Sequence, residues 1–197
     1  MKIEIRSDGT AVLDGYVNVV GRESRVLQDV AGDEFVEIIA PKTFQRALER
    51  NDNVGLMFNH ERDIAPISMR LREDNIGLRA TVEINDLEVL EKAKENKLTG
   101  WSFGFYAAGE TWDTRSDGMK LRTVTAMDLV EVSILDCTPA YIATSIEMRN
   151  DKERLREVRN CLDDVEVVAP QEENRGLGGL ALLRQQKRMF DFMVNVK

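Results

Sequence analysis

The sequence predicts a mainly β fold with inserted helices (α+β), arranged as an antiparallel, closed or nearly closed β-barrel with a helical C-terminal extension. Apolar and polar residues alternate in short runs that glycine, aspartate and asparagine separate, a pattern typical of antiparallel strands. Helical spacing of apolar residues occurs in only two short segments before residue 146. Antiparallel strands with helices only as insertions favour a barrel over a doubly wound parallel sheet.

The strands are predicted from this alternation, in chain order. The turn Ser7–Asp8–Gly9 separates the first two runs and Asp117–Gly118 precedes the last, and both are hairpin signals. Pro139 ends the last run, because proline has no N–H to donate to a neighbouring strand. The predicted strands are Lys2–Arg6, Thr10–Val20, Glu34–Ile39, Val54–Phe58, Ile67–Arg72, Leu78–Ile84, Leu98–Ala107 and Leu121–Leu135.

Two short helices are predicted between these strands. The first begins near Pro41 and ends before Asn51–Asp52–Asn53, since the first turn of a helix accepts proline and asparagine favours turns. The second follows Asn85 or Asp86, either of which can cap a helix N-terminus. Its apolar stripe consists of Leu87, Leu90 and Ala93.

The distribution of charge divides the chain at residue 146. Residues 1–146 carry 17 basic and 25 acidic side chains, whereas residues 147–197 carry 10 of each. We predict one domain over 1–146 and an extension over 147–197, with a helix at Asp151–Leu162, a linker at Pro170–Gly179 and a basic amphipathic helix at Leu180–Val194. The last helix suits packing against the domain, and binding to a partner or a membrane surface is the alternative.

Composition excludes several classes of function. A net charge of −8 argues against a protein that mainly coats phosphate backbones. No apolar run approaches the roughly 20 residues of a membrane span, so neither nucleic acid nor membrane is an expected partner. Cys137 and Cys161 are too few for a disulfide framework or a zinc site, and no cofactor is predicted. His60 is the single histidine, which excludes any mechanism that needs two imidazoles in one chain.

His60 and Ser102 are the first two candidate catalytic residues. His60 follows an apolar strand and begins a charged loop. Ser102 lies on a predicted strand on which the aromatic neighbours Trp101 and Phe103 point to the opposite face. Glycines flank Ser102 at the spacing of a nucleophile elbow, but the required strand–turn–helix pattern is missing. The alternative interpretation is an ordinary strand serine beside Gly104.

Glu131 is the third candidate. It lies between apolar neighbours on a predicted strand and shares a face with Leu129, and a buried acid needs a partner. His60 is one such partner, whereas Arg79 or Arg122 in a structural ion pair is the alternative. A serine, a histidine and an acid are the parts of a hydrolase triad, in which the imidazole takes the hydroxyl proton and the acid orients the imidazole.

Several motifs occur in a specific order along the chain. They are Pro41–Lys42–Thr43–Phe44, Asn59–His60, Ile76–Gly77–Leu78, Ser102–Phe103–Gly104–Phe105, and Leu129–Val130–Glu131–Val132–Ser133 followed by Thr138–Pro139–Ala140. From about Thr10 to Ile146 the sequence therefore resembles the prohead protease family of tailed bacteriophages, capsid maturation serine proteases related in fold to the herpesvirus assembly proteases.

The resemblance implies a barrel of the herpesvirus-protease type in which Ser102 is the nucleophile, His60 the general base and Glu131 the orienting acid. The herpesvirus relatives use a second histidine as the third member, which this chain lacks. The implied substrate is protein: a major capsid protein precursor or a scaffolding protein, and the chain's own extension. The implied location is the assembling procapsid in the host cytoplasm, and assembly as a homodimer or higher oligomer is left open.

Two other functions compete with this interpretation. A non-catalytic capsid-assembly or scaffolding protein would use the barrel as a rigid body and would need no activated serine. A cysteine hydrolase would use Cys137 with His60, but the neighbours of Cys137 include no cation that would lower the pKa of its thiol. Loss of activity in Ser102→Ala together with insensitivity to iodoacetamide would exclude the cysteine hydrolase.

Overall fold

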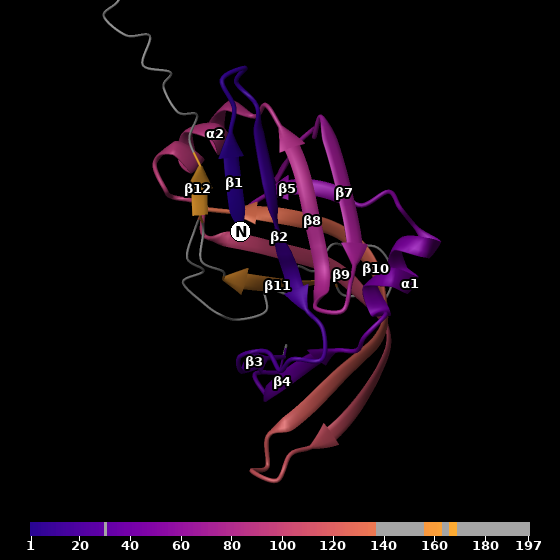
Figure 1. Ribbon diagram of the computed structural model, residues 1–197. Coiled ribbons are helices and arrows are strands. Elements are labelled where there is room, and N and C mark those ends of the chain that lie inside the picture. The colour runs from indigo at the N-terminus through magenta and orange to yellow at the C-terminus, as the bar shows by residue number, and fades with distance from the viewer. Residues whose placement is uncertain (30, 137–155, 163–165, 169–197) are drawn as a thin grey trace, which may run out of the picture.

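The computed structural model describes residues 1–29, 31–136, 156–162 and 166–168. Within these ranges the fold is mainly β, with two sheets and two helices (Figure 1). The first sheet has the strand order β12-β1-β2-β8-β7. Its strands are β12 (Glu166–Val168), β1 (Lys2–Ile5), β2 (Ala11–Val19), β8 (Gly77–Ile84) and β7 (Ser68–Glu73).

The second sheet is built around two long strands. Its main order is β11-β9-β10-β4-β3, and a further strand, β5, pairs with β10 and with β6. These strands are β11 (Arg156–Leu162), β9 (Gly100–Thr114), β10 (Lys120–Leu135), β4 (Glu34–Ile39), β3 (Leu27–Gln28), β5 (Gly55–Phe58) and β6 (Arg62–Asp63). The far end of the β9–β10 hairpin projects from the body as an arm (Figure 1).

The mainly β prediction is confirmed, but the closed barrel is wrong for the described residues. Neither sheet closes on itself, and the pairings of β10 with β4 and β5 and of β1 with β12 are parallel. Alternation along one strand shows which side chains are buried, and it is the same in an open sheet and in a barrel. Closure depends on pairing between distant segments, which alternation does not encode.

Both predicted helices are present. α1 (Thr43–Arg50) buries Phe44 and Ala47. α2 (Leu87–Lys94) begins after Asp86, whose carboxylate accepts a hydrogen bond from the backbone N–H of Val89 at 3.1 Å. An acidic side chain at this position satisfies one of the free N–H groups of the first turn. Within the described residues, no helix has the length and apolar character needed to cross a membrane.

The C-terminal region differs from the prediction. The segment predicted as a helix at Asp151–Leu162 contains strand β11, which pairs antiparallel with β9. Arg156, Glu157 and Arg159 are buried there, although their charge density suggested an exposed helix. The predicted helix at Leu180–Val194 lies outside the described residues. The domain boundary at residue 146 stays a prediction, and β11 and β12 pair with strands that precede it.

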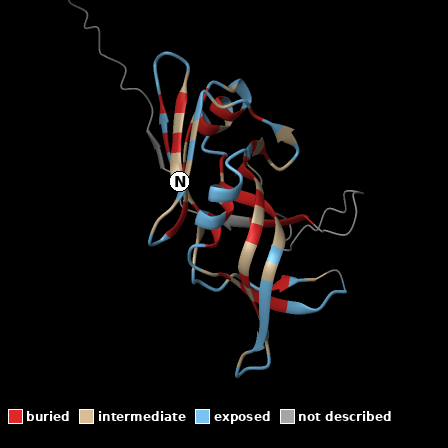
Figure 2. Ribbon diagram, turned by 90° about the vertical axis from the view of Figure 1, so that its right-hand side faces the viewer, coloured by how far each residue is buried: buried red, intermediate tan, exposed pale blue. Residues whose placement is uncertain are grey.

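The core lies between the two sheets. Buried residues alternate with more exposed ones in β1 and β8, and the exposed residues gather on the β9–β10 arm and on the outer turns (Figure 2). Trp101, Phe103 and Phe105 of β9 have no exposed surface. The Phe103 ring packs against Phe44 of α1 at 5.2 Å between ring centroids and stacks on Phe105 at 5.5 Å. The aromatic face of β9 is therefore fixed in the core, which sets the orientation of its other face.

Candidate active site

Ser102 and Gly104 lie on the face of β9 opposite the aromatic core residues. Because side chains alternate along a strand, burial of Trp101, Phe103 and Phe105 directs Ser102 to the other side of the sheet. Ser102 is itself completely buried. The strand continues to Thr114 without a turn into a helix after Ser102, which confirms that the flanking glycines do not form a nucleophile elbow.

A strained two-residue turn positions His60. Asn59 and His60, directly after β5, have φ of 53° and 63°, a left-handed conformation that is costly for residues other than glycine. The Asn59 amide donates to Asp136 Oδ1 at 2.8 Å and its carbonyl oxygen accepts from the Asp136 backbone N–H at 3.1 Å. The His60 backbone N–H donates to Ser133 Oγ at 2.9 Å. The end of β10 thus holds the turn in place.

A β-bulge brings Glu131 to the same side of the sheet as Ser102. Leu129 of β10 pairs with Phe105, and Glu131 pairs with Gly104, so that Val130 is an extra residue on β10. An extra residue reverses the alternation of faces. The prediction that Glu131 shares a face with Leu129 is therefore wrong, because the bulge turns Glu131 away from the aromatic face.

The three predicted residues form a connected hydrogen-bonded set. His60 Nε2 lies 2.6 Å from Ser102 Oγ, and His60 Nδ1 lies 2.8 Å from Glu131 Oε1. The Glu131 side chain is 2% exposed and that of His60 14%. A carboxylate that accepts from Nδ1–H leaves Nε2 without a hydrogen, ready to accept the hydroxyl proton. The arrangement is the one that a hydrolase triad requires, and the catalytic roles stay a prediction.

Arg156 is the partner of Glu131 that sequence reasoning missed. Its Nη2 donates to Glu131 Oε1 at 2.8 Å, and both side chains are buried. The two arginines suggested from the sequence contact other acids: Arg79 pairs with Asp14 at 2.5 Å, and Arg122 contacts Glu37, Glu110 and Glu157. Arg156 belongs to the segment predicted as a charged helix, so that no signal in the sequence connected it with Glu131.

Comparison with known proteins identifies the family. The family model of the caudovirus prohead serine protease matches residues 1–159. The chain belongs to this family. No curated protein and no solved structure gives a match. Family membership confirms the resemblance seen in the sequence and places the chain among serine peptidases of bacteriophage capsid maturation. It also implies a capsid or scaffold protein as substrate and action inside the assembling procapsid.

Gly104 leaves the space in which Glu131 and Arg156 meet in this prohead protease. A Cβ atom added to Gly104 would overlap with Glu131 Oε1 and lie 2.9 Å from Arg156 Nε. A Cβ atom added to Gly55, on the other side of Glu131, would lie 3.5 Å from the Glu131 Cβ atom, an ordinary contact. The two glycines therefore form a matched pair of test positions.

Gly104→Ala is expected to lower kcat/KM for a peptide substrate by about 100-fold, because a displacement of roughly 1 Å in a positioned group has an effect of this size. Gly55→Ala is the control and should retain kcat/KM within a few-fold. Circular dichroism and thermal unfolding show whether both variants fold. Equal activities in the two folded variants would contradict the role of Glu131 at its present position.

A buried ion cluster joins β11 to β4 and β10. Glu37 of β4 accepts from Arg159 at 2.6 and 2.8 Å and from Arg122 at 3.1 Å. Glu157 accepts from Arg159 at 2.6 Å and from Arg122 at 2.7 Å, and Glu110 accepts from Arg122 Nε at 2.7 Å. Burial alone would raise the pKa of Glu157, but the hydrogen bond from Arg122 and the charge of Arg159 lower it below 4.5.

The stability of the protein should therefore fall at acidic pH. Because the pKa of Glu157 is lower in the folded than in the unfolded state, the unfolded state binds more protons, and the stabilisation present above pH 4.5 is lost as the pH falls through the folded-state value. Urea unfolding from about pH 7, where the stabilisation is complete, down to about pH 2.5 measures this loss. Glu157→Gln should show a shallower dependence on pH, and an unchanged slope would contradict the assignment.

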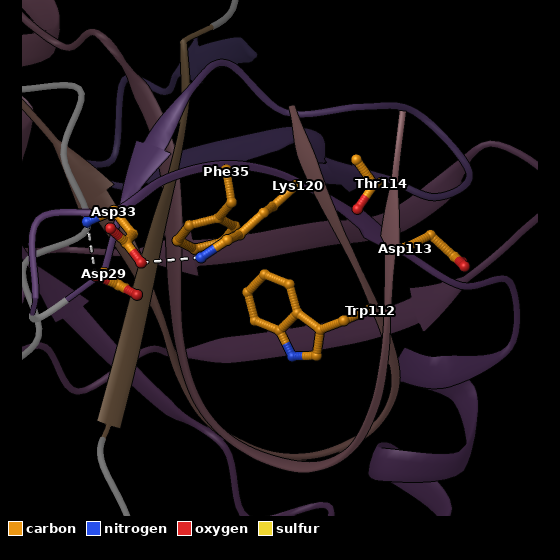
Figure 3. A pocket seen from close by; sticks show the side chains of 7 residues that line it. All are labelled: Asp29, Asp33, Phe35, Trp112, Asp113, Thr114 and Lys120. Atoms are coloured by element: carbon orange, nitrogen blue, oxygen red, sulfur yellow. Dashed lines mark hydrogen bonds and ion pairs between the residues drawn. The ribbon is translucent and has the colours of Figure 1, made fainter. Parts of the chain in front are cut away.

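A pocket of about 590 Å³ lies between the β9–β10 arm and the segment from Asp29 to Phe35 (Figure 3). Phe35, Trp112 and Lys120 are among its lining residues, and Lys120 forms an ion pair with Asp33 at 2.9 Å. Trp112 is ten residues beyond Ser102 on β9, roughly 30 Å along an extended strand. The pocket lining contains no serine, cysteine or histidine.

The described residues offer no group of three or more histidine, cysteine, aspartate or glutamate side chains that could hold a metal ion. Cys137, the nucleophile of the competing cysteine hydrolase, lies outside the described residues.

Proposed function

We propose that this chain is the serine endopeptidase of prohead maturation, with Ser102 as nucleophile, His60 as general base and Glu131 as orienting acid. The observation that carries the proposal is the continuous connection from Glu131 Oε1 through both His60 ring nitrogens to Ser102 Oγ, at 2.8 and 2.6 Å. The substrates are the capsid protein precursor or the scaffolding protein, and segments of the chain's own extension.

The geometry supports acyl transfer in two steps. Ser102 Oγ attacks the carbonyl carbon of the scissile peptide bond while its proton passes to His60 Nε2. Glu131 stabilises the imidazolium that forms, and Arg156 holds the Glu131 carboxylate in place through Oε1. The C–N bond breaks as His60 returns the proton to the leaving amine, and water then hydrolyses the Ser102 ester. The buried position of Glu131 strengthens its interaction with the imidazolium.

Co-expression with the capsid precursor of the same phage tests the proposal. The parent chain and Ser116→Ala, an exposed serine in the β9–β10 turn, should both shorten the precursor. Ser102→Ala should leave it at full length, and a fluorophosphonate should label the parent at Ser102. An uncut precursor in all three experiments, with no label, would favour the non-catalytic assembly protein. Cleavage that iodoacetamide abolishes and Ser102→Ala retains would favour Cys137.

A further inference from the structure

Strand β11 covers the candidate nucleophile. It pairs antiparallel with β9 from Gly100 to Tyr106, and Asn160 lies opposite Ser102. Ser102 has no exposed surface, so that in this state a substrate from another chain cannot reach it. A peptide segment that adds to a sheet edge as a strand is a common way for proteins to bind extended peptides.

The backbone of β11 contacts the reacting atom. The carbonyl oxygen of Arg159 accepts a hydrogen bond from Ser102 Oγ at 2.7 Å. A carbonyl carbon is about 1.2 Å from its oxygen, so that the Arg159 carbonyl carbon lies within about 4 Å of Oγ, close to the 3 to 3.5 Å of an attacking geometry. The chain itself thus supplies a backbone carbonyl within hydrogen-bond distance of the nucleophile.

The hydroxyl hydrogen of Ser102 has two acceptors in this arrangement. A serine hydroxyl has a single hydrogen to donate, while both His60 Nε2 at 2.6 Å and the Arg159 carbonyl at 2.7 Å lie within reach. Donation to the carbonyl competes with donation to the base. The described structure is therefore a resting state. Before attack, Ser102 Oγ or β11 must move slightly, so that the hydroxyl donates to His60 and not to the Arg159 carbonyl.

The Arg159 side chain lies in a buried site whose residues hold its guanidinium group. Glu37 accepts from Arg159 Nε at 2.6 Å and from Nη2 at 2.8 Å, one bond to each carboxylate oxygen. Glu37 is 3% exposed, and the guanidinium carbon lies 5.3 Å from the centroid of the Phe105 ring. A buried carboxylate that forms two parallel bonds, next to an aromatic ring, is specific for a guanidinium group.

We propose that β11 is bound at the active site as the chain's own substrate strand, and that Glu37 selects arginine as the residue whose carbonyl Ser102 attacks. This inference rests on the proposed function. Attack forms the bond from Ser102 Oγ to the Arg159 carbonyl carbon, and the Arg159–Asn160 bond breaks. The Oγ proton passes through His60 to the Asn160 amine. Water then hydrolyses the ester, which leaves a carboxylate at Arg159 and releases residues 160–197.

Intact-mass analysis of the full chain is the first test. The parent and the control Arg115→Leu, on the exposed arm, should yield fragments 1–159 and 160–197, and Ser102→Ala should stay intact. Arg159→Leu should slow this cleavage at least 100-fold, since sites built to hydrogen-bond a polar group reject analogues that lack it by factors on the order of 10⁴. Cleavage of a capsid precursor without a cut after Arg159 would overturn this inference alone. If neither the capsid precursor nor the Arg159–Asn160 bond is cut, the proposed function is overturned together with this inference.

Peptide selectivity is the second test, since Arg159→Leu could weaken the fold. The substrates are a peptide with the sequence of 156–162 and the same peptide with leucine in place of Arg159, and the readout is the ratio of their kcat/KM values. Glu37→Gln should lower the preference for arginine at least 10-fold. Glu110→Gln removes a carboxylate that contacts Arg122 and not Arg159, and should leave the ratio unchanged. A merely structural defect lowers kcat/KM for both peptides together and leaves their ratio unchanged. The same arginine-to-leucine ratio in Glu37→Gln and Glu110→Gln would therefore overturn the role of Glu37.

Discussion

Replacing Ser102 by alanine should lower peptide hydrolysis by on the order of 10⁶-fold, because removal of the nucleophile from a serine triad leaves only binding and electrostatic contributions. The fold should be retained. The hydroxyl contacts His60 and the Arg159 carbonyl, and a serine-to-alanine change removes one oxygen atom without adding volume. Thermal unfolding checks the fold, and hydrolysis of a fluorogenic peptide measures the rate.

Ser116→Ala is the matched control, since Ser116 is exposed in the β9–β10 turn and far from His60 in the strand pairing. It should keep the parent rate within a few-fold. A Ser102→Ala variant that hydrolyses peptide at more than about one hundredth of the parent rate would contradict the nucleophile assignment, because a triad serine cannot be removed at so small a cost.

Replacing Glu131 by glutamine should lower kcat by on the order of 10³ to 10⁴-fold. The carboxylate can only accept at His60 Nδ1, whereas an amide can donate there and leave the hydrogen on Nε2, which then cannot accept the Ser102 proton. The same change breaks the buried ion pair between Glu131 and Arg156, so that the free energy of unfolding should also fall, by roughly 3 kcal/mol.

Glu61→Gln is the control for Glu131→Gln, since Glu61 is exposed in the loop directly after His60. Its activity should match that of the parent. The dependence of kcat on pH separates catalysis from folding: a purely structural role for Glu131 would lower the amount of active enzyme and leave the pH profile unchanged. An unchanged profile together with nearly full activity would remove Glu131 from the triad.

Local patterns in the sequence are sufficient to predict the positions of most strands and of both helices. β4 has the predicted bounds Glu34–Ile39, and β10 begins one residue before the predicted Leu121. The second half of β9, up to Thr114, was missed because its exposed residues alternate less clearly. The short strands β3 and β6 were missed as well, since two-residue strands have no period to detect.

The sequence predicts those residues of the candidate site whose type alone limits the chemistry that they can perform. A single histidine leaves His60 as the only imidazole base, and alternation with three aromatic residues places Ser102 on the other face of β9. Arg156 and the ion cluster around Glu37 were not predictable. A buried arginine and an exposed arginine look alike in a sequence, and only the pairing of β11 with β9 buries these charges.

The sequence by itself determined which residues could act: one histidine, one serine opposite an aromatic stripe, and one acid in an apolar strand. The tertiary structure alone decided that they meet. The bulge at Val130 turns Glu131 toward His60, and the left-handed turn at Asn59 and His60 aims the imidazole at Ser102. The physical reason is that local periodicity reports the burial of one strand at a time, whereas register, bulges and ion pairs depend on segments far apart in the chain, as in the 122-residue separation of Glu37 and Arg159.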